Sequence, residues 1–384
     1  MSQSKKRIAL FAHERGDARV VKRIAALRDQ GWEILGFTFH RDRGRPDTAP
    51  AWDNIDLGTS FNRRYFQRLF TLATSLLILW RERDRLGECS LIYAINTDTA
   101  ALALFGRFLS GSGAPLVLEL ADIQPVMTGR GVSSKCLRAI ERCVMGKSAL
   151  LVTTSPGFVR HYFEPVQKFG GEIFLLENKV YPSAGLPEAN LKSDPVRGGS
   201  PWVVGYFGAF RCRRSMELIH ALAERLPDKI HFTLRGYASG TITDDFAALL
   251  GNLPNVTFQG PYAYPGDLAG MYGAVDFNWC FDESDPSGNS AWLLPNRVYE
   301  GGCFKVPALS AAGTETGSWV AANGCGWEFG EPLEEKLAEF FASVTEAKWS
   351  EMAQRCAAVP EERFKGEADY RRLSERLESI AAGR

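Results

Sequence analysis

The sequence predicts an α/β protein of two doubly wound domains, and three observations carry this prediction. First, an apolar run at 8–12 precedes apolar residues at helical spacing in 18–29 and a second apolar run at 32–37. This βαβ start is typical of a parallel sheet covered by helices. Second, residues 181–201 are rich in proline, glycine and serine, a composition typical of a linker. Third, a new series of strand-like and helix-like segments begins at residue 202.

The remaining elements follow from the same patterns of apolar residues. In the first half, short apolar runs predict strands at 91–95, 116–120, 150–154 and 173–176. In the second half, we expect strands at 202–207, 230–234, 256–258 and 275–279, and helices at 216–226, 246–250 and within 333–382. The expected domains are 1–180 and 202–360, joined by the linker 181–201 and followed by a final segment, 361–384. Two such domains place a ligand cleft between them, at the carboxyl ends of their strands.

The composition is that of an ordinary globular protein and excludes several classes. Of the 384 residues, 45% are hydrophobic and 23% are charged, and the formal net charge is zero. No overall basic field therefore favours nucleic acid as a partner. The eight cysteines form no Cys-x-x-Cys pair and no Cys/His cluster with metal spacing, so no metal site is expected. Without a signal peptide, they are expected to be reduced thiols of a cytoplasmic protein.

The most informative segment is 294–309, which has the pattern of a helix, a glycine turn and a short strand. Pro295 suits the first turn of a helix, and Asn296 is a plausible cap beside it. Glu300 is expected where the helix ends at 301–302. A carboxylate there can accept two hydrogen bonds from a vicinal diol such as a ribose, and glycines let a ligand approach the backbone. The alternative is a solvated glutamate on a surface helix.

A second candidate is the glycine-containing loop 205–215 between a predicted strand and a predicted helix. Such a loop presents N–H groups and the positive end of a helix dipole to an anion. Arg211, Arg213 and Arg214 add charge and bidentate geometry suited to a diphosphate. The alternative is an ordinary basic surface loop.

Residues 294–309 resemble the nucleotide-sugar motif of the GT-B glycosyltransferases, especially the retaining family 4 enzymes. Their pattern is roughly Pro-Asn-Lys-x-x-Glu, a turn of small residues and Gly-x-Pro-Val. Here Arg297 replaces the lysine and Lys305 replaces the glycine. The resemblance extends over about 202–330 and is weaker in the first half. It implies two Rossmann-like domains with a cleft between them, and a ribose held by Glu300. It also implies that the last helix, within 361–384, packs back on the N-terminal domain.

The same resemblance assigns roles in the glycine loop. The family pattern is roughly Gly-Arg-Leu-x-x-x-Lys-Gly, in which Gly208 matches the first glycine and Ala209 replaces the arginine. Arg214 takes the place of the lysine, and Arg211 is the candidate substitute for the missing arginine. Arg211 and Arg214 are thus expected to stabilise the departing diphosphate.

Further donor contacts are expected at 234–237 and around 260–262, which resemble the family, and in the polar loop 282–290 before the motif. The full set of donor-binding candidates is Gly208, Arg211, Arg214, Arg235, Gly236, Tyr262, Asn289, Ser290, Asn296 and Glu300. An ordinary turn is the alternative at 234–237, and a solvated acidic loop is the alternative at 282–290. One departure is clear, because Trp292 stands where family 4 enzymes commonly carry a second glutamate.

Acceptor-binding candidates follow two predicted strands of the first domain. His13, Gly16 and Asp17 lie in the loop after the first strand, and Asp122 lies after the strand at 116–120. The resemblance places this loop near the donor phosphate and the acceptor. Asp122 can orient an acceptor hydroxyl or act as a base, so it joins Arg211 and Arg214 as a catalytic candidate. Helix capping is the alternative for Asp17.

Residues 61–86 combine arginines with an apolar run, 69–80, that ends at Trp80. The run is shorter than the roughly 20 residues needed to span a bilayer. Two interpretations stay open: a helix lying on a membrane surface, and a helix buried against the sheet.

The resemblance therefore implies a cytoplasmic glycosyltransferase, peripheral on the inner face of the membrane if 61–86 binds there. It would move a sugar from a nucleotide diphosphate sugar to a hydroxyl of a glycan or lipid-linked acceptor in exopolysaccharide synthesis. No metal or cofactor is expected, since the nucleotide sugar is a co-substrate. A nucleotide-sugar 2-epimerase of the same fold is one alternative. A non-catalytic nucleotide-binding subunit is another, motivated by Trp292.

Overall fold

The computed structural model describes residues 6–40, 50–59, 74–182, 201–239 and 242–383. The chain forms two compact units. Unit 1 comprises Met1–Glu177 and Glu367–Arg384, and unit 2 comprises Asn178–Gly366. Most of the expected linker (residues 183–200) and the first half of the region 61–86 (residues 61–73) lie outside the described residues.

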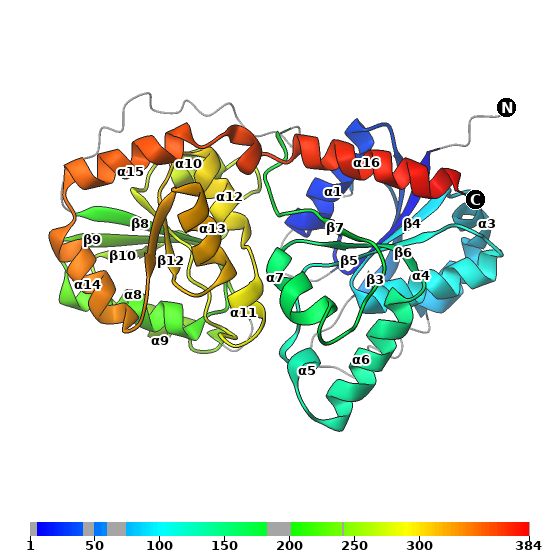
Figure 1. Ribbon diagram of the computed structural model, residues 1–384, viewed down its shortest axis with the longest axis horizontal. Helices are drawn as coiled ribbons and strands as arrows, with labels where there is room; N and C mark the ends of the chain where they lie inside the picture. Colours follow the sequence, from blue (N-terminus) through cyan, green and yellow to red (C-terminus); the bar gives the residue numbers. More distant parts are fainter. Residues whose placement is uncertain (1–5, 41–49, 60–73, 183–200, 240–241, 384) are drawn as a thin grey trace. The chain divides into compact units, whose positions relative to one another are not determined.

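Unit 1 contains a parallel sheet of seven strands in the order β3-β2-β1-β4-β5-β6-β7. Its strands are β1 (Arg7–Ala12), β2 (Glu33–His40), β3 (Asp53–Thr59), β4 (Leu91–Ile95), β5 (Leu116–Leu120), β6 (Ser148–Thr153) and β7 (Ile173–Leu175). Its helices include α1 (Ala18–Asp29), α3 (Arg83–Gly87), α4 (Thr97–Ser110), α5 (Pro125–Thr128), α6 (Val132–Met145), α7 (Pro156–Phe158), η1 (Val159–Phe163) and α16 (Glu367–Ala382). Helices α1 and α16 cover one face of the sheet, and α3, α4 and α6 cover the other (Figure 1).

A buried ionic network joins four elements of unit 1. Glu119 of β5 accepts hydrogen bonds from Arg23 of α1, at 3.0 Å from Nε and 3.0 Å from Nη2. It also accepts one from the hydroxyl of Tyr93 at 2.5 Å, and Arg23 in turn contacts the hydroxyl of Tyr370 on α16. Both charged side chains are fully buried. This network explains why α16, which follows unit 2 in the sequence, belongs to unit 1.

Unit 2 contains a parallel sheet of six strands in the order β10-β9-β8-β11-β12-β13. Its strands are β8 (Trp202–Phe210), β9 (Ile230–Ala238), β10 (Val256–Phe258), β11 (Phe277–Trp279), β12 (Ala308–Ala311) and β13 (Gly326–Phe329). Its helices include α8 (Arg213–Arg225), α9 (Phe246–Leu250), α10 (Leu268–Tyr272), α11 (Asn289–Trp292), α12 (Asn296–Cys303), α13 (Glu315–Asn323), α14 (Leu333–Ser343), α15 (Glu346–Ala358) and η4 (Glu361–Arg363). Helices again cover both faces (Figure 1).

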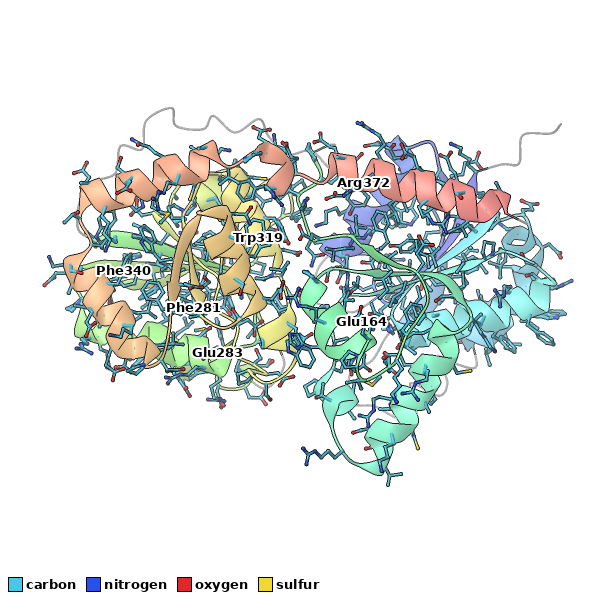
Figure 2. All side chains as sticks on the ribbon, viewed as in Figure 1. Glu164, Phe281, Glu283, Trp319, Phe340 and Arg372 are labelled. Carbon is cyan, nitrogen blue, oxygen red and sulfur yellow. The ribbon has the colours of Figure 1, made fainter. Side chains whose placement is uncertain are left out.

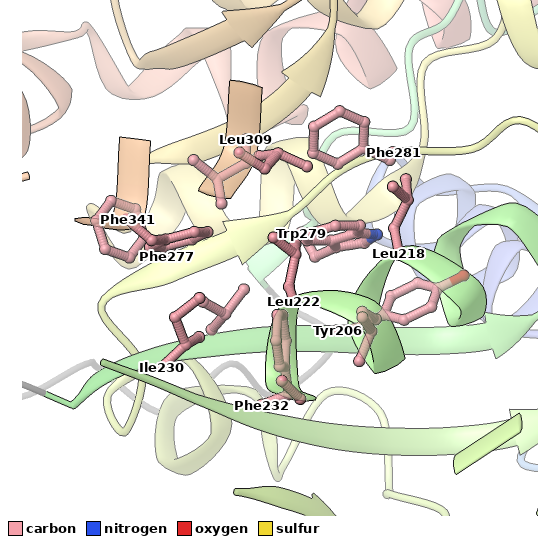
Figure 3. Close-up of a cluster of buried hydrophobic side chains, with 14 of the residues drawn as sticks. Tyr206, Leu218, Leu222, Ile230, Phe232, Phe277, Trp279, Phe281, Leu309 and Phe341 are labelled. Atoms are coloured by element: carbon pink, nitrogen blue, oxygen red, sulfur yellow. The ribbon is translucent and has the colours of Figure 1, made fainter. Parts of the chain in front are cut away.

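The core of unit 2 is aromatic. Trp279 at the end of β11 packs at 4.6 Å from Phe281 and 6.0 Å from Phe232, measured between ring centroids. Leu222 of α8 and Leu309 of β12 complete this part of the core (Figure 3). Burial of such side chains contributes about 1.5–3 kcal/mol each, so the core holds β8 and β11 firmly at the centre of the sheet.

The expected fold class is confirmed: both units are doubly wound parallel α/β structures. The apolar runs located the central strands, but β3 and β13 were not predicted. Both are edge strands, and β3 buries only alternate residues, so neither forms a continuous apolar run. Strands β8 and β9 are longer than expected, so Gly208, Arg235 and Gly236 lie within strands rather than in a loop or turn.

Candidate functional site

The site of unit 2 lies where its strand order reverses. Strand β8 has β9 on one side and β11 on the other, so the chain winds outward in two directions from this point. All strands are parallel, and their carboxyl ends therefore share one edge of the sheet. In folds of this kind, ligands bind at this edge beside the reversal point. The segments that meet there are 211–212 after β8 and 280–290 after β11.

A buried aspartate and an arginine meet at this point. The Nε and Nη2 atoms of Arg211 donate to Asp282 Oδ2 at 3.0 and 2.9 Å. The other carboxylate oxygen accepts hydrogen bonds from the hydroxyls of Ser284 and Ser290 at 2.7 and 2.9 Å. Burial alone would raise the pKa of Asp282, but the charges of Arg211 and Arg297 lower it to about 2. Asp282 is therefore ionised and orients Arg211.

The loop that holds Asp282 is not a solvated acidic loop. Asn289 and Ser290 are buried in α11, and the backbone N–H of Asn289 donates to the carboxylate of Asp285 at 3.1 Å. The hydroxyl of Ser290 also accepts from the backbone N–H of Asp285 at 3.0 Å. Phe281 and Glu283 mark the start of this loop in Figure 2. Internal hydrogen bonds thus fix the loop, and Ser290 supports Asp282.

Arg297 is a second cation at the same point. Its side chain is buried on α12, its Nη2 donates to the carbonyl of Phe281 at 2.9 Å, and its guanidinium lies 5.1 Å from the ring centroid of Tyr206. Its Nε atom is buried without a hydrogen-bond partner among the described residues. A buried donor without a partner costs about 1–3 kcal/mol. We did not include Arg297 among the site residues predicted from the sequence, although its motif position was the available signal.

Arg214 and Arg213 begin α8, directly after Arg211. Arg213 pairs with the carboxylate of Asp245, whereas Arg214 is exposed and its charge acts on Glu283. Cys212 caps the helix, because its Sγ atom accepts from the backbone N–H of Ser215 at 3.2 Å. The first turn of α8 therefore adds the positive end of a helix dipole to the arginines of this edge.

Gly208 and Gly236 lie side by side in the sheet, and both have positive φ angles. Gly208 in β8 has φ +119°, and Gly236 in β9 has φ +148°. A Cβ atom on Gly236 would lie 1.8 Å from the carbonyl oxygen of Gly208. The two strands can therefore approach each other here only with glycine at 236, which explains this residue without a ligand.

Glu300 is buried on α12, and three local expectations need correction. The helix runs on to Cys303 instead of ending at 301–302, and its N-cap is Pro295, with Asn296 as the first helical residue. A Cβ atom on Gly301 would meet the side chain of Asn278, and one on Gly302 would meet the ring of Phe364. The glycines thus allow α12 to pack closely; no ligand is needed to explain them.

The carboxylate of Glu300 has a tyrosine partner. The hydroxyl of Tyr272 on α10 donates to Glu300 Oε2 at 3.1 Å, and Glu300 is 4% exposed. Burial and then the charge of Glu300 raise the pKa of Tyr272, so this tyrosine stays a donor. Lys305 follows the helix with φ +61°, a conformation that favours glycine. This agrees with the glycine that the family motif carries there.

Arg235 and Tyr262 lie on the other side of β8. Arg235 Nη2 donates to the carbonyl of Pro261 at 3.3 Å and to Asp267 Oδ2 at 3.1 Å. Asp267 also accepts from the backbone N–H of Ala263 at 3.0 Å. Burial and then the charge of Glu300 raise the pKa of Tyr262. The segment after β10 is thus tied to β9 by Arg235, whose Nε is buried without a partner among the described residues.

In unit 1 the strand order reverses between β1 and β4, and of the acceptor candidates only those after β1 lie at this reversal. His13, after β1, shares a hydrogen bond of 2.6 Å with Asp98 at the start of α4. Asp17 is the N-cap of α1 and accepts from the backbone N–H of Arg19 at 2.8 Å, so the capping alternative is correct. Asp122 is exposed after β5. Gly16 has open space around its α-carbon.

Two further searches gave negative results for the described part of the chain. No group of three or more His, Cys, Asp or Glu side chains there has the arrangement of a metal site. No helix among the described residues is long and apolar enough to cross a membrane.

The two doubly wound parallel units are those of the GT-B fold. The chain resembles a sucrose-phosphate synthase of Thermosynechococcus elongatus with a TM-score of 0.74, at 16% identity over 99% of this chain and 100% of that one. It resembles Anabaena HepE, solved in complex with UDP and glucose, with a TM-score of 0.69, at 18% identity over 97% of this chain and 100% of that one. At such identities the likeness concerns the fold.

The particular family follows from a closer relative. The chain is 32% identical to the succinoglycan biosynthesis protein ExoL of Rhizobium meliloti over 351 residues, which are 91% of this chain and 87% of ExoL. No protein-family profile matches the chain. The chain belongs to the ExoL family of exopolysaccharide biosynthesis proteins. This assignment confirms the expected class and does not favour the epimerase or the non-catalytic subunit.

Proposed function

We propose that this glycosyltransferase moves a sugar from a nucleotide diphosphate sugar to an acceptor hydroxyl during assembly of an exopolysaccharide. The observation that carries the proposal is the meeting of Arg211, Asp282 and Arg297 at the reversal point of unit 2, with Glu300 on the same helix as Arg297. ExoL is a succinoglycan biosynthesis protein, and HepE was solved with UDP-glucose. Both support the same chemistry for this chain.

The donor would be held by unit 2 in two parts. Glu300 would accept hydrogen bonds from the ribose, because each oxygen of an ionised carboxylate is an acceptor with two lone pairs. The diphosphate would lie against Arg211, Arg214 and the first turn of α8. Asp282 interacts with the charges of Arg211 and Arg297, and the charge of Arg214 acts on Glu283. No metal ion or cofactor is needed in this proposal, since arginines supply the positive charge.

In the transfer step, the bond between the anomeric carbon and the diphosphate oxygen breaks, and the acceptor oxygen forms the new bond to that carbon. The arginines stabilise the negative charge that develops on the departing phosphate. For the retaining course that we propose, the acceptor proton passes to the departing phosphate oxygen, so no protein base is required. Asp122 would orient the acceptor hydroxyl together with His13. Asp17 is already used as a helix cap, which makes it the weaker acceptor candidate.

Calorimetry with UDP, GDP, ADP and their sugars tests the donor site. The Glu300→Gln variant should bind the preferred nucleotide more weakly by about 1.5–3 kcal/mol, because charge-assisted hydrogen bonds to the ribose are lost. Glu328→Gln, on edge strand β13, is the matched control. Equal affinity of wild type and Glu300→Gln would contradict the ribose assignment. Acceptor-dependent release of nucleoside diphosphate, with the anomer of the product determined by NMR, tests the reaction and its stereochemistry.

Arg211 requires a paired substitution. Arg211→Ala alone leaves Asp282 buried without its cation and is expected to destabilise the loop. The double variant Arg211→Ala/Asp282→Ala removes both charges and isolates the loss of diphosphate binding.

A further inference from the structure

We propose that α5 and α6 of unit 1 form a docking surface for an anionic membrane. The inference goes beyond the proposed function and does not rest on it. It starts from an unusual distribution of side chains on α6. Large hydrophobic side chains usually lie on the buried face of a surface helix, and here Val132, Leu137 and Ile140 are exposed.

The exposed face of α6 is apolar along its length. Val132 is 78% exposed and Ile140 is 53% exposed, and Cys136 and Cys143 between and beyond them are also exposed. Positions 132, 136, 140 and 143 follow helical spacing and form one stripe. Val126 on α5 is exposed as well. Helices α5 and α6 project from unit 1, so the stripe is accessible on that unit (Figure 1).

The buried face of α6 carries a polar network around Glu141, beside the buried side chains of Val144 and Met145. Glu141 accepts hydrogen bonds from the hydroxyl of Tyr162 and the amide of Gln167, both at 2.6 Å, and from the hydroxyl of Thr97 at 3.1 Å. Arg138 donates to the carbonyls of Met127 and Gly129 and so holds α5 against α6. These contacts fix the helix with its apolar stripe outward.

The charge of the segment that contains α5 and α6 indicates which partner binds this surface. Segment 125–147 contains five basic residues, Arg130, Lys135, Arg138, Arg142 and Lys147, against one acidic residue, Glu141, in a chain whose formal net charge is zero. Glu141 is buried, whereas Arg130, Lys135 and Lys147 are exposed. The exposed surface of this segment is therefore apolar with basic flanks, which is the pattern of a helix that lies in the interface of an anionic bilayer.

A second copy of the chain fits this surface less well. In a two-fold symmetric dimer the same patch would face itself, and the exposed cations would oppose their own copies. An anionic lipid surface instead offers negative charge to the cations and an apolar layer to Val132 and Ile140.

Co-sedimentation of the full chain with vesicles tests the proposal. Wild type should bind vesicles of phosphatidylcholine with phosphatidylglycerol, bind weakly to pure phosphatidylcholine, and be released by salt. Lys135→Glu/Lys147→Glu should lower the partition coefficient at least about tenfold, from about 1 kcal/mol for each cation lost. Ile140→Ser should lower it as well. Lys336→Glu/Arg355→Glu in unit 2 changes the net charge equally and should bind as wild type does.

Four outcomes would overturn the proposal. The first is wild-type protein that stays in the supernatant at low salt. The second is α6 variants that bind vesicles like wild type and remain folded by circular dichroism. A dimer in analytical ultracentrifugation that Ile140→Ser dissociates would assign the surface to a second copy. Loss of binding in Leu77→Ser/Trp80→Ser alone would assign membrane binding to the region 61–86 instead.

Discussion

Each unit buries a carboxylate against an arginine, and the two pairs differ in how they meet solvent. In unit 1, Arg23 and Glu119 are both fully buried and their polar atoms contact Tyr93 and Tyr370. In unit 2, Asp282 is buried but the side chain of Arg211 is 39% exposed. The first pair is closed to any ligand. The second exposes part of its arginine side chain at the edge of the sheet where ligands bind.

The difference shows how the same pair of residue types takes two roles. The pair of unit 1 connects β5, α1, β4 and α16 and serves stability. In unit 2, Asp282 orients Arg211, which the proposed donor would contact. Arg297 lies beside this pair, and its Nε has no hydrogen-bond partner among the described residues. Four predictions test this contrast, from the largest expected effect to the smallest.

Breaking the closed pair should cost the most stability. Glu119→Ala leaves Arg23 buried without its carboxylate, and we expect a loss of about 3–5 kcal/mol in the free energy of unfolding measured with urea. The double variant Arg23→Leu/Glu119→Leu should recover much of that loss, because no buried charge remains. A single variant as stable as wild type would show that Arg23 finds another partner or water.

Breaking the pair of Arg211 and Asp282 should cost less stability, and this cost should depend on pH. The folded-state pKa of Asp282 is about 2 against a usual 3.8, so its contribution is full above about pH 4 and is lost as the pH falls towards about 2. Asp282→Asn should therefore lower stability by about 2 kcal/mol at neutral pH and by progressively less in acid. Asp245→Asn, which breaks the exposed pair with Arg213, should cost at most about 1 kcal/mol. A pH-independent difference would contradict this origin.

Cations at the open edge should affect ligand binding rather than folding. Arg214→Ala should weaken binding of the nucleoside diphosphate about tenfold and leave nucleoside binding and the melting temperature nearly unchanged. Arg213→Ala is the adjacent control, since that arginine already pairs with Asp245. If both variants bind the diphosphate like wild type, Arg214 faces solvent without a ligand.

The smallest effect is expected in unit 1. Asp122→Asn should raise the KM for the acceptor several-fold with a moderate loss of turnover, because the proposed course needs no protein base. Asp17→Asn should change neither, since asparagine also caps helices well. A loss of turnover of about 10²–10⁴-fold in Asp122→Asn would indicate a general base and favour an inverting course.

The sequence by itself determined the central strands, the class and the motif that carries Arg297 and Glu300. It could do so because parallel strands are apolar on both faces and because a motif is local in the chain. Edge strands and α6 were not predicted from the sequence, because β3 alternates in burial and α6 carries its apolar stripe on the exposed face.

Only the tertiary structure decided which charges meet. Arg211 and Asp282 are separated by 71 residues, and Arg23 and Tyr370 by 347. Their pairing depends on strand order and on the return of α16 to unit 1, which no local pattern encodes. The roles of Gly236, Gly301 and Gly302 were likewise set by packing, because what a Cβ atom would meet there belongs to segments distant in the sequence.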